Sequence, residues 1–540
     1  MADDATRTIA SLLRERARET PDKLMVIDPA VRVTYRELDL STRALGAAFV
    51  EAGIGPGSRV GLIMPNSSRW VQIALALTRI GAVLVPFSTL LAPRELRAQL
   101  EVSSVSHLIT TEEFRGHRYL DDLAAALDRG VLEPGELIEP GLPALRRIWT
   151  VDEVLGTNHS PDTEPVVDAL SESVTPGDPM VIIFTSGSSG IPKGVIHSHG
   201  GALGAVGSGL TARCIDSDTR LYLPMPFFWV GGFGAGILSA LLAGATLITE
   251  EIPVPETTLE LLERERVTLF RGWPDQAAAL ARQSETVGAD LSSLRAGSLD
   301  ALLPVDQRAE RGARANLFGM TESFGPYSGY PADRDMPPSA WGSCGKPFDG
   351  MEIRIADPET GAPVAVGGTG EIRLRGPHVL LGICRRQREE VFTADGSYRT
   401  GDLGHLDEDG FLFYHGRSDD MVKVSGATVY PSEVQAALKS IDGVDNAFVT
   451  HVDGATGPQV AAAVVCHREV SADDLRRAAK KVMSSFKVPT LWLVLDSDDT
   501  VPRGGTGKVD ARGLRELFVH VGPESDKSAP AAAGTRQAEA

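Results

Sequence analysis

The sequence predicts an α/β protein with a large N-terminal domain of parallel α/β sheets, a small β unit and a smaller α+β C-terminal domain. Short apolar segments alternate with amphipathic helical segments through the first half of the chain. From about residue 345 to residue 415 the pattern changes to short strands broken by Gly, Pro and Asp, and helix and strand patterns return after Arg417. We therefore expect an N-terminal domain at 1–417, a C-terminal domain at 418–520 and a disordered tail at 521–540.

The parallel sheets are predicted from strands and helices that follow one another near the N-terminus. Apolar strands are expected at 24–28, 59–64 and 82–87, with amphipathic helices between them at 35–53 and 69–81. Consecutive strands joined by helices pair in parallel, and the helices cover the faces of the sheet. The segments MEIRIADPETG, GEIRLRG and DEDGFLFYHGR contain turn residues instead, which favours a small, mostly antiparallel unit.

One apolar segment, VGGFGAGILSALLAGATLI at 230–248, has 19 residues without a charge, which is near the length that spans a bilayer. It contains five glycines, has no basic flank and is followed by Thr249, Glu250 and Glu251. We interpret it as a buried helix that runs into a short buried strand, and expect no transmembrane segment.

The composition excludes several classes of protein. A net charge of −19 over 540 residues argues against nucleic acid as a partner, since a duplex binder needs a basic surface. The four cysteines are scattered and form no CxxC pair, which fits a reducing compartment better than a zinc site or a disulfide framework. The N-terminus lacks the apolar region of a secretory signal, so we expect a cytoplasmic protein, with a homodimer as one allowed assembly.

The segment FTSGSSGIPKG at 184–194 continues from the apolar run MVIIF. Gly-rich loops with hydroxyl side chains that follow a strand often bind phosphate, because their backbone N–H groups can all turn toward one anion. The alternative is a flexible linker of similar composition. The loop is not a Walker A motif, because Lys193 lies between Pro192 and Gly194, and a second Gly-rich loop, GGTGK at 504–508, also departs from that motif.

Three further polar clusters lie between the two loops. NLFGMTES at 316–323 places Thr321 and Glu322 after a glycine, and a carboxylate beside a hydroxyl suits a hard cation that carries phosphate oxygens. YRTGDLG at 398–404 places Asp402 in a predicted Gly-flanked turn, where it could accept hydrogen bonds from sugar hydroxyls. GRSDDMVKVSG at 416–426 groups charged residues at the predicted domain junction. Taken singly, Asp402 could be only a turn residue, and Arg417 with Asp419 only a surface ion pair.

Together and in this order, the chain's motifs resemble the successive signatures of the adenylate-forming superfamily. The motifs are FTSGSSGIPKG, NLFGMTE, YRTGDL, GRSDDMVKVSGATVYPSEV and PRGGTGK. This superfamily contains acyl-CoA synthetases, the adenylation domains of nonribosomal peptide synthetases and firefly luciferase. The resemblance runs from about residue 8 to residue 518 and is nearest to the acyl-CoA synthetases. It implies that a carboxylate attacks the α-phosphate of ATP to give acyl-AMP and pyrophosphate, with Mg²⁺ bound, and that the C-terminal domain is mobile.

The resemblance also implies roles for individual residues. Thr321 would contact the α-phosphate, Glu322 would bind Mg²⁺, and Lys508 would bridge the carboxylate and the phosphate during catalysis. The β- and γ-phosphates would bind to the loop residues Thr185, Ser186, Gly187, Ser188, Ser189, Gly190 and Lys193. Phe318 would stack near the adenine, with Gly319 in the same nucleotide-binding segment, and Asp402 and Arg417 would hold the ribose.

In the second half-reaction, the family rotates its C-terminal domain and opens a channel for a thiol. Asp419 matches the hinge residue, and Gly426 matches the glycine past which the pantetheine arm of coenzyme A runs. We therefore expect coenzyme A as the acceptor.

Two departures from the family concern the acyl pocket. Many acyl- and aryl-CoA synthetases have a His where this chain has Trp229, and amino-acid-activating relatives have an Asp in the same segment. An ammonium group buried there without a partner would be costly, so a free amino acid is not expected. RAGSLDALL at 295–303 replaces a Gly-Gly-Ala-Pro type of turn. The predicted acyl pocket consists of Phe228, Trp229, Gly231, Gly297 and Ser298.

The sequence thus predicts an ATP-dependent carboxylic acid–CoA ligase that acts on a hydrophobic or aromatic acid. One alternative is an adenylating enzyme that passes the acyl group to an amine or to a carrier-protein thiol. A second is a non-catalytic relative, which the presence of Lys193, Glu322 and Lys508 argues against. His197 and His199 have a spacing that could bind metal, but such residues more often pack at the start of a helix.

Overall fold

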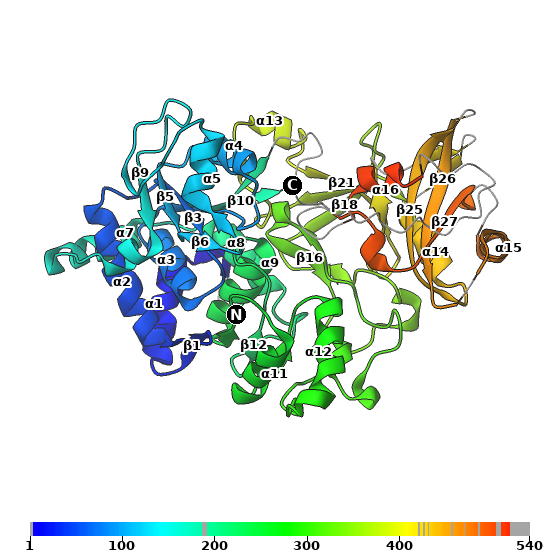
Figure 1. The fold of residues 1–540 in the computed structure, drawn as a ribbon, viewed down its shortest axis with the longest axis horizontal. Helices are drawn as coiled ribbons and strands as arrows, with labels where there is room; N and C mark the ends of the chain where they lie inside the picture. The colour runs from blue at the N-terminus through cyan, green and yellow to red at the C-terminus, as the bar shows by residue number, and fades with distance from the viewer. Residues whose placement is uncertain are drawn as a thin grey trace, which may run out of the picture. The chain divides into compact units, whose positions relative to one another are not determined.

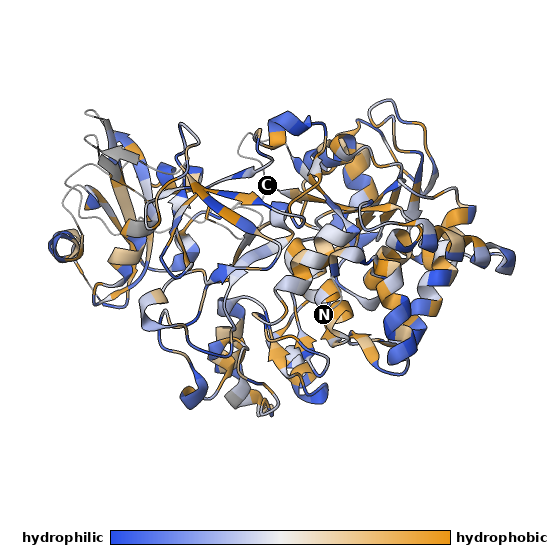
Figure 2. Cartoon of the chain, turned by 180° about the vertical axis from the view of Figure 1, so that it is seen from behind, coloured by the Kyte–Doolittle hydropathy of each residue, from blue (hydrophilic) through white to orange (hydrophobic). Residues whose placement is uncertain are grey.

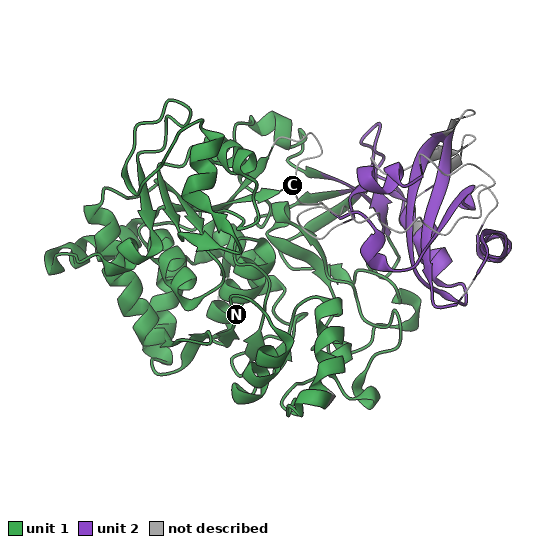
Figure 3. Ribbon diagram, viewed as in Figure 1, with its two compact units in different colours: residues 1–354, 373–399, 406–413 green, residues 355–372, 400–405, 414–540 purple. Residues whose placement is uncertain are grey.

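The structure, a computed structural model, describes residues 4–185, 192–418, 422–424, 427–429, 431–454, 457–468, 470–483, 487–503 and 509–518. The chain divides into two compact units (Figure 3). The first contains residues up to Arg354 together with Arg373–Arg399 and Leu406–Phe413. The second contains Ile355–Ile372, Thr400–His405 and the chain from Tyr414 onward. The boundary expected between 417 and 418 stays a prediction, and the expected tail lies outside the described residues.

The first unit contains an eight-stranded sheet in the order β20-β11-β10-β4-β3-β5-β9-β8. Its central strands pair in parallel: β10 (Pro179–Thr185), β4 (Val83–Pro86), β3 (Arg59–Ile63), β5 (His107–Thr110) and β9 (Arg147–Thr150). The outer strands pair antiparallel: β11 (Lys193–Ser198), β20 (Gly382–Ile383) and β8 (Gly135–Glu136). The predicted parallel sheet is therefore present, and it has antiparallel edges.

Both faces of this sheet are buried. Leu84 and Ile109 pack into one apolar cluster with α2 (Tyr35–Glu51) and α3 (Ser68–Arg79). Their neighbours Val83 and Leu108 pack into another cluster, with α4 (Pro93–Ser103) and α5 (Tyr119–Ala126). Successive side chains of a strand point to opposite faces, so a strand buried on both sides appears in the sequence as a continuous apolar run. Figure 1 shows the sheet between these two groups of helices.

A second sheet of the first unit has the order β14-β12-β13-β1-β2. Four strands are parallel and β2 is antiparallel: β14 (Leu269–Phe270), β12 (Arg220–Tyr222), β13 (Thr246–Ile248), β1 (Leu24–Ile27) and β2 (Arg32–Thr34). Further helices of this unit include α1 (Ile9–Glu19), α6 (Val151–Gly156), α7 (Glu164–Ser173), α8 (His199–Ser208), α11 (Pro255–Arg264), α12 (Pro274–Val287) and α13 (Arg388–Val391). β6 (Glu113–Phe114) and β7 (His117–Arg118) form a small hairpin.

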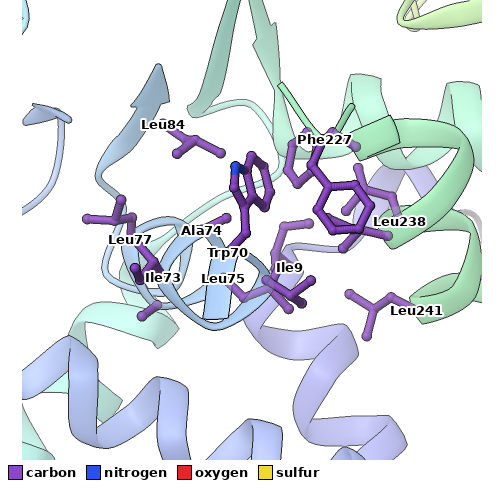
Figure 4. Packing of buried hydrophobic residues seen from close by; sticks show 14 of the residues in the cluster. Ile9, Trp70, Ile73, Ala74, Leu75, Leu77, Leu84, Phe227, Leu238 and Leu241 are labelled. Atoms are coloured by element: carbon purple, nitrogen blue, oxygen red, sulfur yellow. The ribbon is translucent and has the colours of Figure 1, made fainter. Parts of the chain in front are cut away.

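The largest apolar cluster surrounds Trp70, which is fully buried (Figure 4). The rings of Phe227 and Phe233 meet Trp70 edge-on, with centroids 5.4 and 5.7 Å away. Figure 2 shows that helices of the first unit carry hydrophobic residues on one side and hydrophilic residues on the other. The capping boxes of α1 and α2, at Thr8 and Thr34, fix where these amphipathic helices begin.

The charge-free segment at 230–248 is a buried helical segment followed by a strand, as predicted. It consists of α9 (Val230–Gly232), the π-helix η3 (Phe233–Leu238), α10 (Ser239–Ala243) and then β13. Gly244 ends the helix in the left-handed conformation, at φ 67°. Within the described ranges, we find no helix with the length and apolar character that crossing a membrane requires.

Two smaller sheets follow. β15 (Phe318–Met320), β16 (Gly325–Gly329) and β17 (Lys346–Pro347) form an antiparallel sheet. β18 (Glu352–Ala356), β19 (Gly370–Arg375), β21 (Tyr398–Leu406) and β22 (Leu412–Arg417) form a four-stranded sheet in this order. The chain passes from one unit to the other within each of these four strands.

The second unit contains a three-stranded sheet with its own apolar clusters. β25 (Val444–Gly454) and β26 (Gly457–Cys466) pair antiparallel, and β27 (Leu491–Leu495) pairs in parallel with β26. Its helices are α14 (Pro431–Lys439), α15 (Ala472–Val482) and α16 (Ala511–Glu516), and β23 (Val422–Val424) pairs with β24 (Ala427–Val429). The α+β character predicted for this part of the chain is present.

Candidate active site

The predicted phosphate loop joins two antiparallel strands. Thr185 is the last residue of β10 and pairs with Lys193, the first residue of β11. The strands on either side of the loop therefore pair antiparallel, whereas a Walker A loop leads from a strand into a helix. Five of its predicted phosphate-binding residues, Ser186, Gly187, Ser188, Ser189 and Gly190, lie outside the described residues.

Lys193 contacts Glu322, 129 positions later in the chain. The Nζ of Lys193 lies 2.6 Å from Oε1 of Glu322 and donates a second hydrogen bond to the hydroxyl of Tyr398, at 2.9 Å. The Tyr398 hydroxyl donates to the same Oε1 at 3.0 Å. The structure thus brings together the loop lysine and the carboxylate that the sequence singled out, and adds a tyrosine that the prediction did not name.

The segment that presents Glu322 is a tight turn between β15 and β16. Thr321–Ser323 form the single turn η6, and Phe324 and Gly325 then adopt φ values of 52° and 114°. The hydroxyl of Ser323 donates to the carbonyl oxygens of Met320 and Gly325, and the backbone N–H of Leu380 donates to the carbonyl oxygen of Glu322. These bonds hold the backbone of a carboxylate that is itself buried.

Thr321 is held by His197, a fully buried side chain of β11. Nε2 of His197 lies 2.7 Å from the carbonyl oxygen of Thr321. Burial lowers the pKa of His197 to about 4, so the ring is neutral at pH 7 and donates the Nε2 proton to that carbonyl. The ring also meets Phe324 edge-on, with centroids 4.9 Å apart. His197 therefore fixes the turn that carries Thr321 and Glu322.

Phe318 and Gly319, predicted for the nucleotide, are both in β15. The ring of Phe318 meets Tyr327 edge-on at 5.5 Å. An added Cβ on Gly319 would lie only 2.1 Å from the carbonyl oxygen of Gly325. Position 319 therefore requires glycine because β16 passes so close.

A cavity of about 280 Å³ lies beside this turn in the first unit. Most of its lining is apolar, and the polar contributions include Thr321 and Arg213. The lining residues are Ile183, Ala205, Val206, Arg213, Trp229, Val230, Gly231, Ala235, Leu317, Gly319, Met320, Thr321, Phe324, Gly325 and Pro326. Two predicted acyl-pocket residues, Trp229 and Gly231, thus share one cavity with two residues predicted for the nucleotide, Gly319 and Thr321.

The other residues predicted for the acyl pocket are not among the lining residues of this cavity. Phe228 is buried against Trp229, with ring centroids 5.2 Å apart. Gly297 has φ 95°, which keeps the turn expected there, and the hydroxyl of Ser298 accepts a hydrogen bond from the backbone N–H of Phe270. Their assignment to the acyl pocket stays a prediction.

Asp402 and Arg417, both in the second unit, form an ion pair. Nη1 of Arg417 lies 3.3 Å from Oδ1 of Asp402 and donates to the carbonyl oxygen of Thr400 at 3.1 Å. The prediction that Asp402 occupies a turn is wrong, since it lies within β21. The preceding Gly401 has a positive φ, and a side chain there would meet the Arg417 guanidinium. The glycine that predicted a turn is therefore a residue of positive φ inside the strand.

Comparisons with known proteins place these residues in a family. Residues 13–384 match the AMP-binding enzyme family. The chain belongs to this family. It is 32% identical to the 3-[(3aS,4S,7aS)-7a-methyl-1,5-dioxo-octahydro-1H-inden-4-yl]propanoyl:CoA ligase of Mycobacterium tuberculosis, over 95% of this chain and 99% of that protein. It is 30% identical to a feruloyl-CoA synthase of Amycolatopsis, over 93% and 97% of the two chains.

Solved structures share the fold. The O-succinylbenzoate coenzyme A synthetase of Bacillus subtilis, solved with ATP and magnesium ion, has a TM-score of 0.72 at 23% identity, over 94% of this chain and 98% of that one. The predicted superfamily and fold class are confirmed. The predicted enzyme class, an AMP-forming acid–CoA ligase, is confirmed as well.

Three predicted residues of this AMP-binding enzyme, Asp419, Gly426 and Lys508, lie outside the described residues. Two residues that the structure adds were within reach of the sequence. Tyr398 opens the motif YRTGDLG, and His197 follows the phosphate loop, where only a metal site or helix packing was weighed. Arg213 also lines the cavity, and no feature of the sequence predicts this.

Proposed function

We propose that this AMP-binding enzyme activates a hydrophobic or aromatic carboxylic acid as acyl-AMP and transfers the acyl group to coenzyme A. The observation that carries the proposal is the cavity that Trp229 and Gly231 share with Gly319 and Thr321. An acid bound against the apolar wall would have its carboxylate near the turn that the family uses for the α-phosphate. Adenylation needs this juxtaposition, because the two reacting groups must be held in contact.

The lining favours an apolar acid. Trp229, Val230 and Leu317 offer no counter-charge to an ammonium group, and burying one without a partner would be costly. The acids named for two relatives, a propanoic acid on a fused ring and ferulic acid, are carboxylic acids with bulky apolar frameworks. The cavity of about 280 Å³ is near the lower end of the volumes usual for small-molecule sites.

Glu322 fits the binding of Mg²⁺. Its Oε1 receives both the Lys193 ammonium and the Tyr398 hydroxyl, whereas its Oε2 receives no hydrogen bond from the described residues. Mg²⁺ is usually held by one or two carboxylates together with phosphate oxygens, and this carboxylate has one oxygen available for it. When bound, the ion would neutralise charge on the phosphates. Lys193 would then leave Glu322 and turn to the phosphates that the 185–193 loop holds.

The remaining roles follow the family resemblance. We assign Thr321 to the α-phosphate, Phe318 to the adenine, and Asp402 with Arg417 to the ribose. The reacting carboxylate meets a polyanion, so positive charge held in place beforehand should lower the barrier most. Lys508 would supply that charge as a mobile ammonium.

For the second step, we assign Asp419 to the hinge and Gly426 to the passage of the pantetheine arm. The acceptor we propose is the thiol of coenzyme A, as the named relatives indicate. A cytoplasmic location and a homodimer stay predictions.

The test is acid-dependent exchange of labelled pyrophosphate into ATP across a panel of fatty, aryl and cyclic acids. We expect exchange with at least one bulky apolar acid, and loss of free thiol when coenzyme A is then added. Absence of exchange with every acid would contradict the proposal. Exchange without thiol consumption, but with product formed from an added amine, would contradict only the choice of acceptor.

A further inference from the structure

Arg213 is a buried cation in the wall of the substrate cavity. It follows the C-terminal end of α8, lines the cavity, and is 5% exposed. The other residues of this helical wall, Ala205, Val206 and Ala235, are apolar. Other lining residues come from the β15–β16 region and include Thr321. A charged side chain among small apolar ones requires an explanation, because burying a charge is costly unless it is compensated.

The described residues accept hydrogen bonds from only part of the Arg213 guanidinium. Nε donates to the carbonyl oxygen of Gly209, Nη1 to the hydroxyl of Ser239, and Nη2 to the carbonyl oxygen of Val206, at 3.1, 3.0 and 2.6 Å. These acceptors are all neutral, and two of them are carbonyl oxygens at the end of α8, where the helix dipole favours a cation. An arginine has five N–H groups, so one on each Nη has no acceptor among the described residues.

A second guanidinium increases the positive charge. Nη2 of Arg271 donates to the backbone carbonyl oxygen of Arg213 at 2.9 Å, and the buried Nε of Arg271 has no hydrogen-bond partner among the described residues. Among the described residues, neither arginine has a carboxylate oxygen within 4.0 Å, although Arg32, Arg220 and Arg264 all pair with Glu265 elsewhere in the same unit. Burial, together with the charge of Arg271, lowers the pKa of Arg213 to about 9, so it remains protonated at pH 7.

We propose that Arg213 recognises a second oxygen acceptor on the substrate, apart from the carboxylate that is activated. The inference rests on the proposed function, because it places the reacting carboxylate near Thr321 and the other end of the acid against the helical wall. The acceptor is a carbonyl or a second carboxylate carried on an otherwise apolar framework. Its oxygen accepts hydrogen bonds from the two N–H groups that have no acceptor among the described residues.

This geometry selects against an acid without such an oxygen. An unsubstituted acid of the same shape would pack against the apolar lining and exclude water from the two N–H groups. It would offer them no acceptor in return. Sites built to hydrogen-bond a substrate group reject analogues that lack it strongly, because their buried polar groups are then left unpaired. Arg213 is thus a specificity-determining residue, anchored by Ser239 and by the end of α8.

The experiment compares sets of three acids on one framework: unsubstituted, with a ring ketone, and with a second carboxylate. The full chain is assayed by pyrophosphate exchange for each acid. We expect the ketone acid, the dicarboxylic acid or both to exceed the unsubstituted acid by at least about tenfold in kcat/KM. The better of the two identifies the acceptor. Equal rates, or a preference for the unsubstituted acid, would overturn the inference and leave the proposed function intact.

Variants then locate the effect. Arg213→Met should abolish the preference, because the unsubstituted acid then leaves no buried N–H group unsatisfied, whereas Arg213→Lys should keep part of it. Arg295→Met is the matched control, because Arg295 donates to the neighbouring carbonyl oxygen of Cys214 but is not among the lining residues. It should leave the preference unchanged. Equal loss for all three acids in both Arg213 variants would assign Arg213 a structural role and overturn the inference.

If Arg213→Met does not fold, the comparison of the three acids in the wild-type chain and in Arg213→Lys still tests the inference. Absence of exchange with any acid, substituted or not, would contradict the proposed function itself and this inference with it.

Discussion

Two buried carboxylates of this AMP-binding enzyme, one in each unit, are paired with cations in different ways. Glu322 receives a lysine and a tyrosine on the same oxygen, at 2.6 and 3.0 Å. Asp402 receives one nitrogen of Arg417 at 3.3 Å, and the same nitrogen also bonds the Thr400 carbonyl oxygen. The Lys193 side chain is 21% exposed, and that of Arg417 is 41% exposed.

The difference indicates two kinds of preorganisation. A lysine is a point charge on a flexible stem, and can leave its carboxylate when a metal or a phosphate arrives. An arginine is a planar group, and when it is fixed to a backbone carbonyl it holds the carboxylate in one orientation. We infer that Lys193 leaves Glu322 during the reaction. The pair of Asp402 and Arg417 instead keeps one geometry and binds neutral hydroxyl groups of the ligand.

The largest effect is expected when the charge of Glu322 is removed. Glu322→Gln keeps the shape but no longer attracts a divalent cation, so pyrophosphate exchange should fall by about 10²–10³-fold. Asp402→Asn is the matched variant in the other cluster and should lose far less activity. Similar losses in the two variants would remove the distinction between an exchanging and a fixed carboxylate.

The second effect concerns stability at low pH in the Glu322 region. Burial lowers the pKa of His197 to about 4, below its ordinary value of 6.5. As the pH falls from about 6.5 to about 4, the unfolded chain binds this proton before the folded chain does, so the protein loses stability, by at most about 3 kcal/mol from this group. His197→Gln should make the pH dependence shallower, as measured by thermal unfolding between pH 7 and pH 4.

His199 must be separated from that result. Burial lowers its pKa to about 4 as well, so it should contribute a similar loss in the same pH range. The single variant should therefore remove only part of the pH dependence. An unchanged profile in His197→Gln would mean that His197 is not the neutral donor to Thr321.

A smaller effect is expected at the fixed pair. Arg417→Lys keeps the charge, but an ammonium does not reproduce the planar group that spans Asp402 and the Thr400 carbonyl oxygen. We expect the KM for ATP to rise by roughly tenfold, with kcat changed much less, because the interaction is the same in the ground state and the transition state. A fall in kcat with an unchanged KM would contradict the assignment to ribose binding.

The smallest effect is expected at Tyr398. Tyr398→Phe removes the hydroxyl shared by Lys193 and Glu322 but keeps the ring that packs edge-on against Phe392. A single hydrogen bond to a charged group is worth about 1.5–3 kcal/mol at most, and Lys193 compensates for part of it, so we expect only a several-fold change. The change should be largest in the Mg²⁺ concentration that gives half-maximal pyrophosphate exchange. A change in the KM for the acid alone would contradict this role.

Much of the fold was predictable because it rests on local patterns. The strands at 24–27, 59–63 and 83–86 and the helices between them follow from apolar runs and from capping residues such as Thr34. Contacts between distant segments were only partly predictable. That Lys193 and Glu322 belong to one site followed from the order of the motifs, but their contact and the part played by Tyr398 depend on how three separate segments pack.

The cavity wall shows the limit of sequence reasoning more clearly. Trp229 and Gly231 were predicted from their motif, whereas Arg213 lies in the stretch ARCIDSD, which has no recognisable pattern. An arginine in such a stretch is normally expected at the surface. Its burial depends on acceptors from Val206, Gly209 and Ser239, which only the folded chain assembles.

The π-helix η3 connects Trp229 to Ser239 and has a consequence for how this enzyme could diverge. A π-turn contains one residue more than the α-helical turn it replaces, and each residue rotates a helix by roughly 100°. Because the π-turn absorbs this extra residue, deleting one residue between Phe233 and Leu238 would restore an α-helical turn and leave Ser239 facing the guanidinium it anchors. Relatives could therefore gain or lose one residue at this turn while the anchor of Arg213 stayed in place.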